Sequence, residues 1–263
     1  AAAPMTSQST CDVRDVSAYV KKLAPRQFDP DRRIVIGYVA AEFWFHSAGF
    51  TLLPVLAHHD HSKFEIVCYS CSPVRDEVTA KFESLADVWV EAGRLSDDQL
   101  ADRIEADKVD ILIDVSGHTT GNRLPVFARK PAPIQVSGFG HATGTGLRTM
   151  DYVLADPVFI PQSARHLLAE KVHDLPCLIT IDPILDVPPS ELPMLRNGYV
   201  TFGVFNRIYK ISDEAIRVWS RVMREVTGSK IIIKHTMLDD PLVRDRLIAR
   251  FVAHGVAEAN ITC

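Results

Sequence analysis

Two apolar runs, each followed by polar residues and a helix start, most constrain how this chain can fold. The first run, 33–40, breaks into polar and aromatic residues at 42–46, and the second, 199–205, breaks at 206–210 before a helix start at 211–214. A short apolar run, a polar turn and a helix form the opening of a βα unit with a buried parallel strand. Ligands of open α/β sheets bind at the carboxyl ends of such strands. The two openings therefore predict two α/β domains facing one cleft.

Composition places the chain among ordinary globular proteins. Its 263 residues are 47% hydrophobic and 24% charged, and the net charge of −4 gives no basic excess for nucleic acid or an anionic membrane. The five cysteines form an odd, scattered set, which predicts reduced thiols in a cytosolic protein. The first residues lack a signal-peptide pattern, and no uncharged apolar run approaches the ~20 residues that span a bilayer. We therefore expect a cytoplasmic protein.

Apolar runs alternate with helical patterns along the first domain, which predicts a parallel sheet with crossover helices. The predicted strands are 34–39, 63–69, 88–90, 109–115, 133–136 and 152–155. Residues 1–31 are polar and contain prolines, and we interpret them as a linker or tail. The proline-rich stretch 182–198 predicts a boundary between an α/β domain at 32–187 and another at 188–263. The second domain holds only about half of a mononucleotide-binding fold. We therefore expect it to be incomplete and the chain to be part of a longer protein.

The turn after the second apolar run carries the sharpest local feature. Lys210 lies directly before a helix whose predicted N-cap is Ser212. A helix N-terminus has unpaired N–H groups and about half a positive charge, so it attracts phosphate. Lys210 adds a full, mobile charge that can follow a phosphate as it departs. The alternative is that Lys210 is a solvated surface lysine.

Two loops of the first domain follow predicted strands. In the first, small and hydroxyl residues, among them Thr119 and Thr120, let a ligand approach the backbone closely. Asp114, inside the preceding apolar strand, needs a partner when buried, and we predict Arg123 for this role. The second loop, 138–146, has four glycines but matches neither established phosphate-loop spacing. A flexible turn is the alternative there.

His46 follows the first apolar run. An imidazole titrates near neutral pH and can remove the proton of a hydroxyl acceptor. The chain has ten histidines, so a structural or exposed position is the alternative. The sequence has no Ser/His/Asp elbow and no His-x-x-x-His zinc pair.

Several segments, taken together, resemble the catalytic region of the O-linked N-acetylglucosamine transferases. They are residues 34–43 with His46, then 114–123, 129–135, 140–146 with 150–152, and 205–211. Their order and spacing hold from about residue 33 to 236. The form with His118 and compact loops resembles a bacterial member of the family.

This resemblance implies an α/β protein with two Rossmann-like domains of a GT-B type glycosyltransferase, the second incomplete in this chain. It implies transfer of N-acetylglucosamine from UDP-N-acetylglucosamine to protein serine or threonine hydroxyls, with inversion and without a metal or another cofactor. The implied partners are the UDP-sugar donor, the protein acceptor, the rest of the catalytic region and tetratricopeptide repeats outside this chain.

The resemblance also carries site residues over by position. The histidine at His46 is a proposed general base and acceptor-side group, Lys210 contacts the UDP diphosphate, and Tyr209 lies near the sugar–phosphate linkage. Asn206 belongs to the same nucleotide-side turn. The segments that border the sugar contribute His118, Thr119, Thr120, Gly138, Gly140, His141 and Gly144. Arg207, His118 and His141 stand where the animal enzymes have other residues, which leaves their roles open.

Two other functions remain open from the residues. One is a GT-B transferase that uses another nucleotide sugar or acceptor, and the other is a catalytically silent module that binds nucleotides or proteins. A dinucleotide dehydrogenase does not fit, because the strand, Gly-x-Gly-x-x-Gly, helix opening is not found in the sequence.

Overall fold

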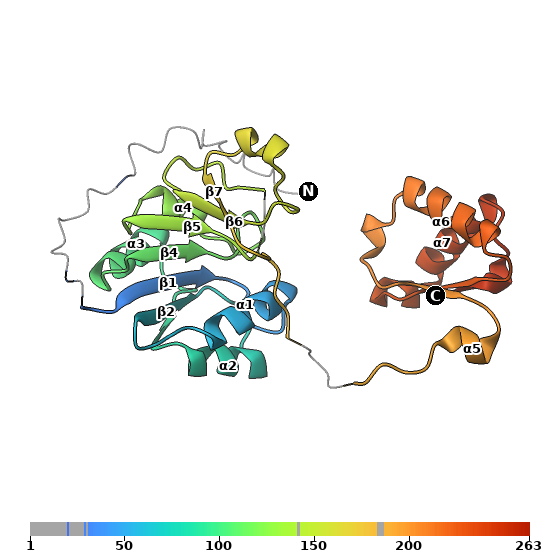
Figure 1. Ribbon diagram of the computed structural model, residues 1–263, viewed down its shortest axis with the longest axis horizontal. Coiled ribbons are helices and arrows are strands. Elements are labelled where there is room, and N and C mark those ends of the chain that lie inside the picture. The colour runs from blue at the N-terminus through green and yellow to red at the C-terminus, as the bar shows by residue number, and fades with distance from the viewer. Residues whose placement is uncertain (1–19, 21–28, 30, 141–142, 183–186) are drawn as a thin grey trace, which may run out of the picture. The chain divides into compact units, whose positions relative to one another are not determined.

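The computed structural model describes residues 20, 29, 31–140, 143–182 and 187–263. The chain divides into two compact units, one of residues 1–184 and the other of residues 185–263 (Figure 1). Within the described residues, no helix combines the length and apolar character that a membrane crossing requires.

The first unit is built on a seven-stranded sheet in the order β3-β2-β1-β4-β5-β6-β7. Every neighbouring pair is parallel, so the predicted α/β architecture with a parallel sheet is confirmed. The strands are β1 Ile34–Ala40, β2 Phe64–Ser70, β3 Val88–Glu91, β4 Ile111–Asp114, β5 Ile134–Ser137, β6 Tyr152–Ala155 and β7 Lys171–Asp174.

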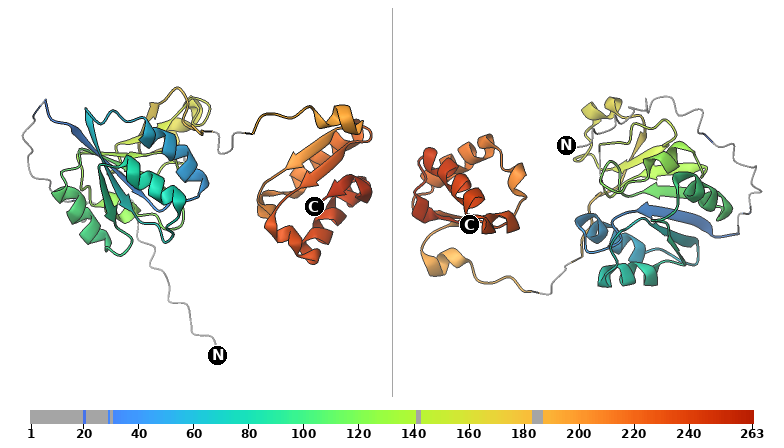
Figure 2. Two further views of the ribbon diagram at one scale, coloured as in Figure 1. Left: turned by 90° about the horizontal axis from the view of Figure 1, so that it is seen from below. Right: turned by 180° about the vertical axis from the view of Figure 1, so that it is seen from behind.

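Helices cover both faces of this sheet. Helices α1 and α2 lie on one face and α3 on the other (Figure 2). Alternate residues of β1 supply the two cores: Tyr38 packs with Leu56 and Phe82 of α1 and α2, and Val39 packs with Leu100 of α3. The helices are α1 Ser47–Ala57, α2 Glu77–Leu85, α3 Asp97–Ala106, α4 Leu124–Ala128 and the 3-10 helix η2 Gln162–Leu167.

The strand order fixes where this sheet can bind a ligand. From β1 the chain runs outward through β2 to β3, and from β4 it runs the other way to β7. From β1 and β4 the chain therefore continues in opposite directions, and ligands of open α/β sheets bind at the carboxyl ends of the two strands where this reversal occurs. His46 lies in the loop after β1, and the 117–123 loop follows β4.

The second unit has a three-stranded parallel sheet in the order β10-β9-β8. Helices α6 and α7 lie against the sheet (Figure 1). They share one apolar core with it, in which the rings of Trp219 and Phe251 stack with centroids 6.5 Å apart. The elements are α5 Pro193–Asn197, β8 Thr201–Val204, η3 Ile208–Lys210, α6 Asp213–Glu225, β9 Lys230–Ile233, η4 Thr236–Asp239, α7 Pro241–Ala253, η5 Glu258–Asn260 and β10 Ile261–Thr262.

Candidate active site

A buried carboxylate joins the loops that leave β1 and β4. Glu42, only 5% exposed, accepts hydrogen bonds from the amide of Ala41 at 3.0 Å and from the Ser116 hydroxyl at 2.5 Å. Its other oxygen lies 2.7 Å from the Thr119 hydroxyl. These contacts supply the partners that a buried carboxylate requires. They also fix the predicted ligand residue Thr119 relative to the end of β1.

Asp114 closes β4 and is 1% exposed. Its carboxylate accepts from the amide of Gly117 at 3.1 Å and from the Ser137 hydroxyl at 3.0 Å. Burial raises the pKa of Asp114 to about 6. The predicted pairing with Arg123 is wrong, because these nearby donors satisfy the carboxylate.

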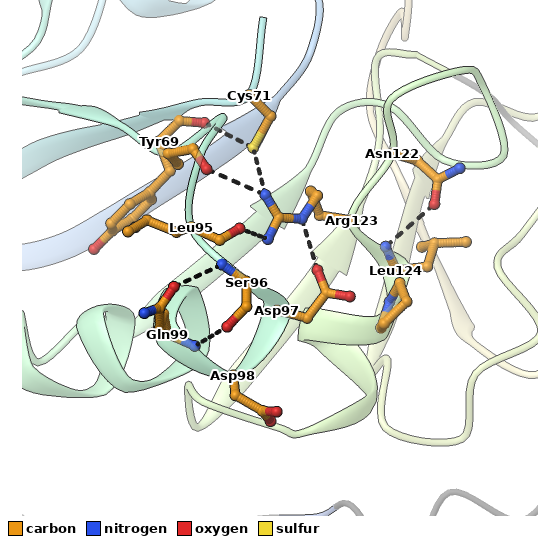
Figure 3. A network of polar contacts seen from close by, with 12 residues as sticks. Tyr69, Cys71, Leu95, Ser96, Asp97, Asp98, Gln99, Asn122, Arg123 and Leu124 are labelled. Carbon is orange, nitrogen blue, oxygen red and sulfur yellow. Dashed lines mark hydrogen bonds and ion pairs between the residues drawn. The ribbon is translucent and has the colours of Figure 1, made fainter.

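Arg123 instead holds the neighbouring strand ends together (Figure 3). Its Nε donates to Asp97 at 2.7 Å, at the start of α3. Its Nη2 donates to the Leu95 carbonyl at 2.8 Å, and its Nη1 donates to the Ala92 carbonyl at 3.2 Å and lies 3.7 Å from the Cys71 sulfur. The loop after β4 is therefore tied to the ends of β2 and β3.

The loop after β5 approaches the backbone of the loop after β4 very closely. A Cβ on Gly140 would lie 1.6 Å from the carbonyl oxygen of Val115, so only glycine fits. Phe139 has a φ of 68°, which is unusual for a bulky residue and costs about 1–3 kcal/mol. This turn borders an apolar cavity of about 100 Å³ lined by Gly138, Phe139, Gly140, Leu154, Phe159, Leu178 and Ile179.

A second buried acid fixes the end of the glycine-rich loop. Glu170, 5% exposed, accepts from the amide of Thr145 at 2.6 Å and from its hydroxyl at 2.5 Å. Gly144, a predicted sugar-side residue, has a φ of 74° and lies beside this carboxylate. His141 lies outside the described residues.

His46 is the N-cap of α1. Its Nδ1 accepts a hydrogen bond from the amide of Ala48 at 3.2 Å, and its ring lies 5.3 Å from that of Trp44 between centroids. The preceding residue, Phe45, donates its amide to Asp76 at 2.8 Å, which ties this loop to the start of α2. The imidazole is half-buried at the carboxyl end of β1.

The sheet brings several predicted residues of the first unit to one edge. His46 follows β1, the adjacent strand β4 carries His118, Thr119 and Thr120 on its loop, and Gly138 and Gly140 follow β5. His118 and Thr120 are exposed, whereas Thr119 is half-buried against Glu42.

The predicted residues of the second unit lie on the turn after β8. The Asn206 side chain accepts from the amide of Arg207 at 2.9 Å. Arg207 donates to the Tyr209 hydroxyl at 2.6 Å, with its guanidinium 6.0 Å from the ring centroid. Lys210 ends η3, is exposed, and makes no ion pair with any residue in the described part of the chain.

The acids in the first turn of α6, beside Lys210, are paired with arginines and so oppose the positive end of the helix dipole less. Ser212 caps α6 by accepting the amide three residues on at 3.1 Å. The two acids of the first turn are both paired, Asp213 with Arg250 at 2.6 Å and Glu214 with Arg217 at 2.5 Å. Their negative charges are therefore largely compensated at the place where Lys210 and the helix dipole add.

A larger cavity of about 460 Å³ lies beside β8, whose outer edge pairs with no strand that the structure describes. Its lining is mostly apolar, and among the predicted residues it includes Asn206. The lining residues are Phe202, Gly203, Val204, Phe205, Asn206, Trp219, Val222, Met223 and Ile231.

Sequence reasoning missed three buried residues that fix the loops, namely Glu42, Ser116 and Glu170. Glu42 stands in the polar break after the first apolar run, so its position was a usable signal. Nothing in the sequence signalled that Ser116 and Glu170 would be buried, because serine and glutamate are ordinarily exposed.

Parallel sheets with polar loops gathered at their carboxyl ends define an open-sheet α/β protein of the ligand-binding kind. Residues 13–182 match glycosyl transferase family 41, and the chain belongs to this family. The resemblance to O-linked N-acetylglucosamine transferases is thereby confirmed.

Relatives and a solved structure agree with this assignment. The "probable UDP-N-acetylglucosamine–peptide N-acetylglucosaminyltransferase SPINDLY" of Arabidopsis thaliana is 32% identical over 239 residues, 89% of this chain and 26% of the relative. A UDP-N-acetylglucosamine–peptide N-acetylglucosaminyltransferase of Caenorhabditis elegans is 32% identical over 148 residues, 55% of this chain and 13% of the relative.

A solved mutant O-GlcNAc transferase from Thermobaculum terrenum matches with a TM-score of 0.83 and 30% identity, over 97% of this chain and 51% of its own. The predicted GT-B type fold is confirmed by this match. The chain spans about a quarter of the Arabidopsis relative and about half of the solved chain.

Proposed function

We propose that the full-length protein transfers N-acetylglucosamine from UDP-N-acetylglucosamine to serine or threonine hydroxyls of proteins. Membership of family 41 and the names of the relatives support this reaction. Residues 32–187 form the acceptor-side domain, and residues 188–263 begin the domain that binds the UDP-sugar. We place the protein in the cytoplasm, with tetratricopeptide repeats outside this chain selecting acceptors.

The observation that carries the proposal is the charge of Lys210 beside the start of α6, and no residue that the structure describes pairs with this charge. The first-turn acids of that helix are paired with Arg217 and Arg250, so its N–H groups and Lys210 act together on an anion. A departing diphosphate gains negative charge as its bond to the sugar breaks. Lys210 stabilises that charge, while Asn206, Arg207 and Tyr209 hold the nucleotide side.

The reaction is a single displacement with inversion. The acceptor oxygen bonds to the anomeric carbon from one side while the bond to the diphosphate breaks on the other. The bonding electron pair goes to the diphosphate oxygen, and the hydroxyl proton leaves to a base. Because Lys210 and the helix end supply positive charge to the leaving group, no metal ion is required.

The loops of the first unit hold the acceptor and the sugar. His118 and Thr120 are exposed at the edge of the sheet, and Gly138 and Gly140 let the backbone approach the sugar. Thr119 holds this loop in place beside the sugar, because its hydroxyl is engaged by Glu42 and the Ser116 carbonyl, and its backbone is bonded to Ser116 and Asn122. Gly144 and His141 complete this set.

Replacing Lys210 with alanine in the full-length protein tests this proposal. Removing one preorganised contact to developing charge typically costs roughly 3 kcal/mol, so transfer should fall about a hundredfold or more. The control is Arg246→Ala, which removes an exposed cation from α7 of the same unit and should leave turnover unchanged. A loss below about tenfold with intact folding removes Lys210 from this role.

Radiolabelled transfer from several nucleotide sugars tests the donor. We expect UDP-N-acetylglucosamine to label protein acceptors faster than UDP-glucose or a GDP-sugar. Faster labelling from another donor would reassign the substrate, and binding of UDP without any transfer would favour a silent nucleotide-binding module.

A further inference from the structure

The helix cap made by His46 determines which of its ring nitrogens carries the proton. A backbone N–H can only donate, so Nδ1 must offer its lone pair to the Ala48 amide, 3.2 Å away. A neutral imidazole has one N–H group, which must then be on Nε2. Turning the ring over would put a carbon at the cap and leave the Ala48 donor without its acceptor.

Two further contacts hold the ring in this orientation. The Trp44 ring lies against it with centroids 5.3 Å apart, and the Trp44 indole is itself fixed by donating to the Ala41 carbonyl at 3.1 Å. The amide of Phe45 is held by Asp76. Within the residues that the structure describes, no group accepts a hydrogen bond from Nε2 of His46.

We infer that neutral His46 presents Nε2–H as a hydrogen-bond donor to an oxygen of the protein acceptor, and does not remove the hydroxyl proton. This inference rests on the proposed function for the identity of the acceptor. A general base must offer a lone pair at the nitrogen that faces the hydroxyl, and Nε2 has none while the cap is made. The acceptor proton must therefore leave to another base, and an oxygen of the departing diphosphate, which gains negative charge in the same step, can accept it.

The two roles differ in size. A neutral hydrogen bond contributes about 0.5–1.5 kcal/mol, so losing the donor should slow transfer about twofold to tenfold. A general base contributes roughly a hundredfold to ten-thousandfold. Kinetics of suitable variants can therefore separate a donor from a base.

The tautomer can be measured without any assay of activity. The protein is labelled with ¹⁵N in its histidine rings, and long-range ¹H–¹⁵N correlations are recorded well above the ordinary histidine pKa of about 6.5. The signals of His46 are those missing from the His46→Asn variant. We expect a lone pair on Nδ1 and a proton on Nε2.

The same spectrum contains two internal references. His235 also caps a helix, accepting the Met237 amide on Nδ1 at 3.1 Å, so it should show the same tautomer. The Nδ1 of His58 lies 2.7 Å from the Pro54 carbonyl, which can only accept, so His58 should show the opposite one. A proton on Nδ1 of His46, matching His58, would overturn the inference.

Two substitutions then test the donor role in transfer by the full-length protein. His46→Asn keeps an acceptor at the cap but has no group at the place of Nε2, whereas His46→Gln keeps an N–H near that place. We expect the Asn variant to melt like the wild type and to lose about twofold to tenfold in kcat/KM, and the Gln variant to recover most of that loss.

Other outcomes contradict the donor role. A loss of a hundredfold or more in both variants is the signature of a base, and unchanged transfer by His46→Asn reduces His46 to a helix cap. Absence of any transfer by the wild type would count against the proposed function, while the NMR measurement would still decide the tautomer.

Discussion

At the scale of single residues, buried acids hold the loops of the candidate site. Glu42 fixes Thr119, Asp114 fixes Gly117 and Ser137, and in each case neutral donors replace the water that burial removed. Neither Gly117 nor Ser137 brings a positive charge to the Asp114 carboxylate. The charged form of Asp114 is therefore left with a net cost of burial, which explains the direction of its pKa.

Replacing Asp114 with asparagine should make stability less dependent on pH. The folded-state pKa of about 6 lies above the unfolded value of about 3.9. The stabilising contribution of the protonated form is therefore fully present below pH 4 and is lost as pH rises through about 6. Relative to the variant, the wild type should lose about 2–3 kcal/mol between pH 4 and 7, as measured by urea unfolding.

Asp156 offers a control of opposite sign. It accepts backbone amides from Phe159 and Leu178, which lower its pKa, so its contribution is present above the unfolded pKa and lost in acid. Asp156→Asn should therefore lose stability at neutral pH and little in acid. A stability difference between wild type and Asp114→Asn that stays constant with pH would contradict our account of Asp114.

Residue pairing was the least predictable part of the site. The sequence indicated that Asp114 would be buried and would need a partner, and this was right. It could not show that Ser137 comes from the adjacent strand β5, or that Arg123 turns towards Asp97 and two carbonyls. Such pairings depend on register and loop path, which hydrophobic periodicity does not encode.

At the scale of elements, buried strands were predictable and the exposed edge was not. Strands β1 to β6 are apolar runs of the kind that parallel sheets bury, and all six were expected near their observed positions. Strand β7 was missed because only Val172 of its four residues is half-buried, while Lys171, His173 and Asp174 are exposed. A strand with polar residues on both faces lacks the pattern that marks strands.

The loop after β5 gives a sharp prediction at this scale. Gly140→Ala should lower the free energy of unfolding by about 3 kcal/mol or more, because the new methyl group meets the Val115 carbonyl and the backbone must move. Gly146→Ala is the matched control. Its φ of 76° is strained for alanine but nothing lies within 4 Å, so a cost of about 1–2 kcal/mol is expected.

Chemical denaturation measures the loss of stability in each variant, and Gly140→Ala should lose more than Gly146→Ala. Equal losses for Gly140→Ala and Gly146→Ala would show that close approach to Val115 does not determine the path of the loop.

At the scale of the whole molecule, the chain carries two units with different chemistry at their carboxyl edges. The first unit gathers histidine, hydroxyl and glycine loops after β1, β4 and β5. The second unit offers a lysine and a capped helix start after β8. The repeated pattern of strand, turn and helix was sufficient to predict that polar loops gather at the carboxyl ends of the strands in both units. This arrangement follows from parallel strands alone.

The effect of metal ions on transfer can be measured with the full-length protein. We expect transfer to continue at an unchanged rate after treatment with EDTA, because in the proposed mechanism Lys210 and the start of α6 bring the positive charge that a metal would otherwise bring to the diphosphate. A loss of transfer that Mg²⁺ or Mn²⁺ restores would contradict metal-independent catalysis.

The proposed function depends on the binding of a diphosphate at the turn after β8. Its most direct test is a crystal structure of the full-length protein with UDP. We predict that the diphosphate lies within hydrogen-bonding distance of the Lys210 ammonium and the first amides of α6. A nucleotide bound with its diphosphate away from residues 206–212 would contradict this proposal.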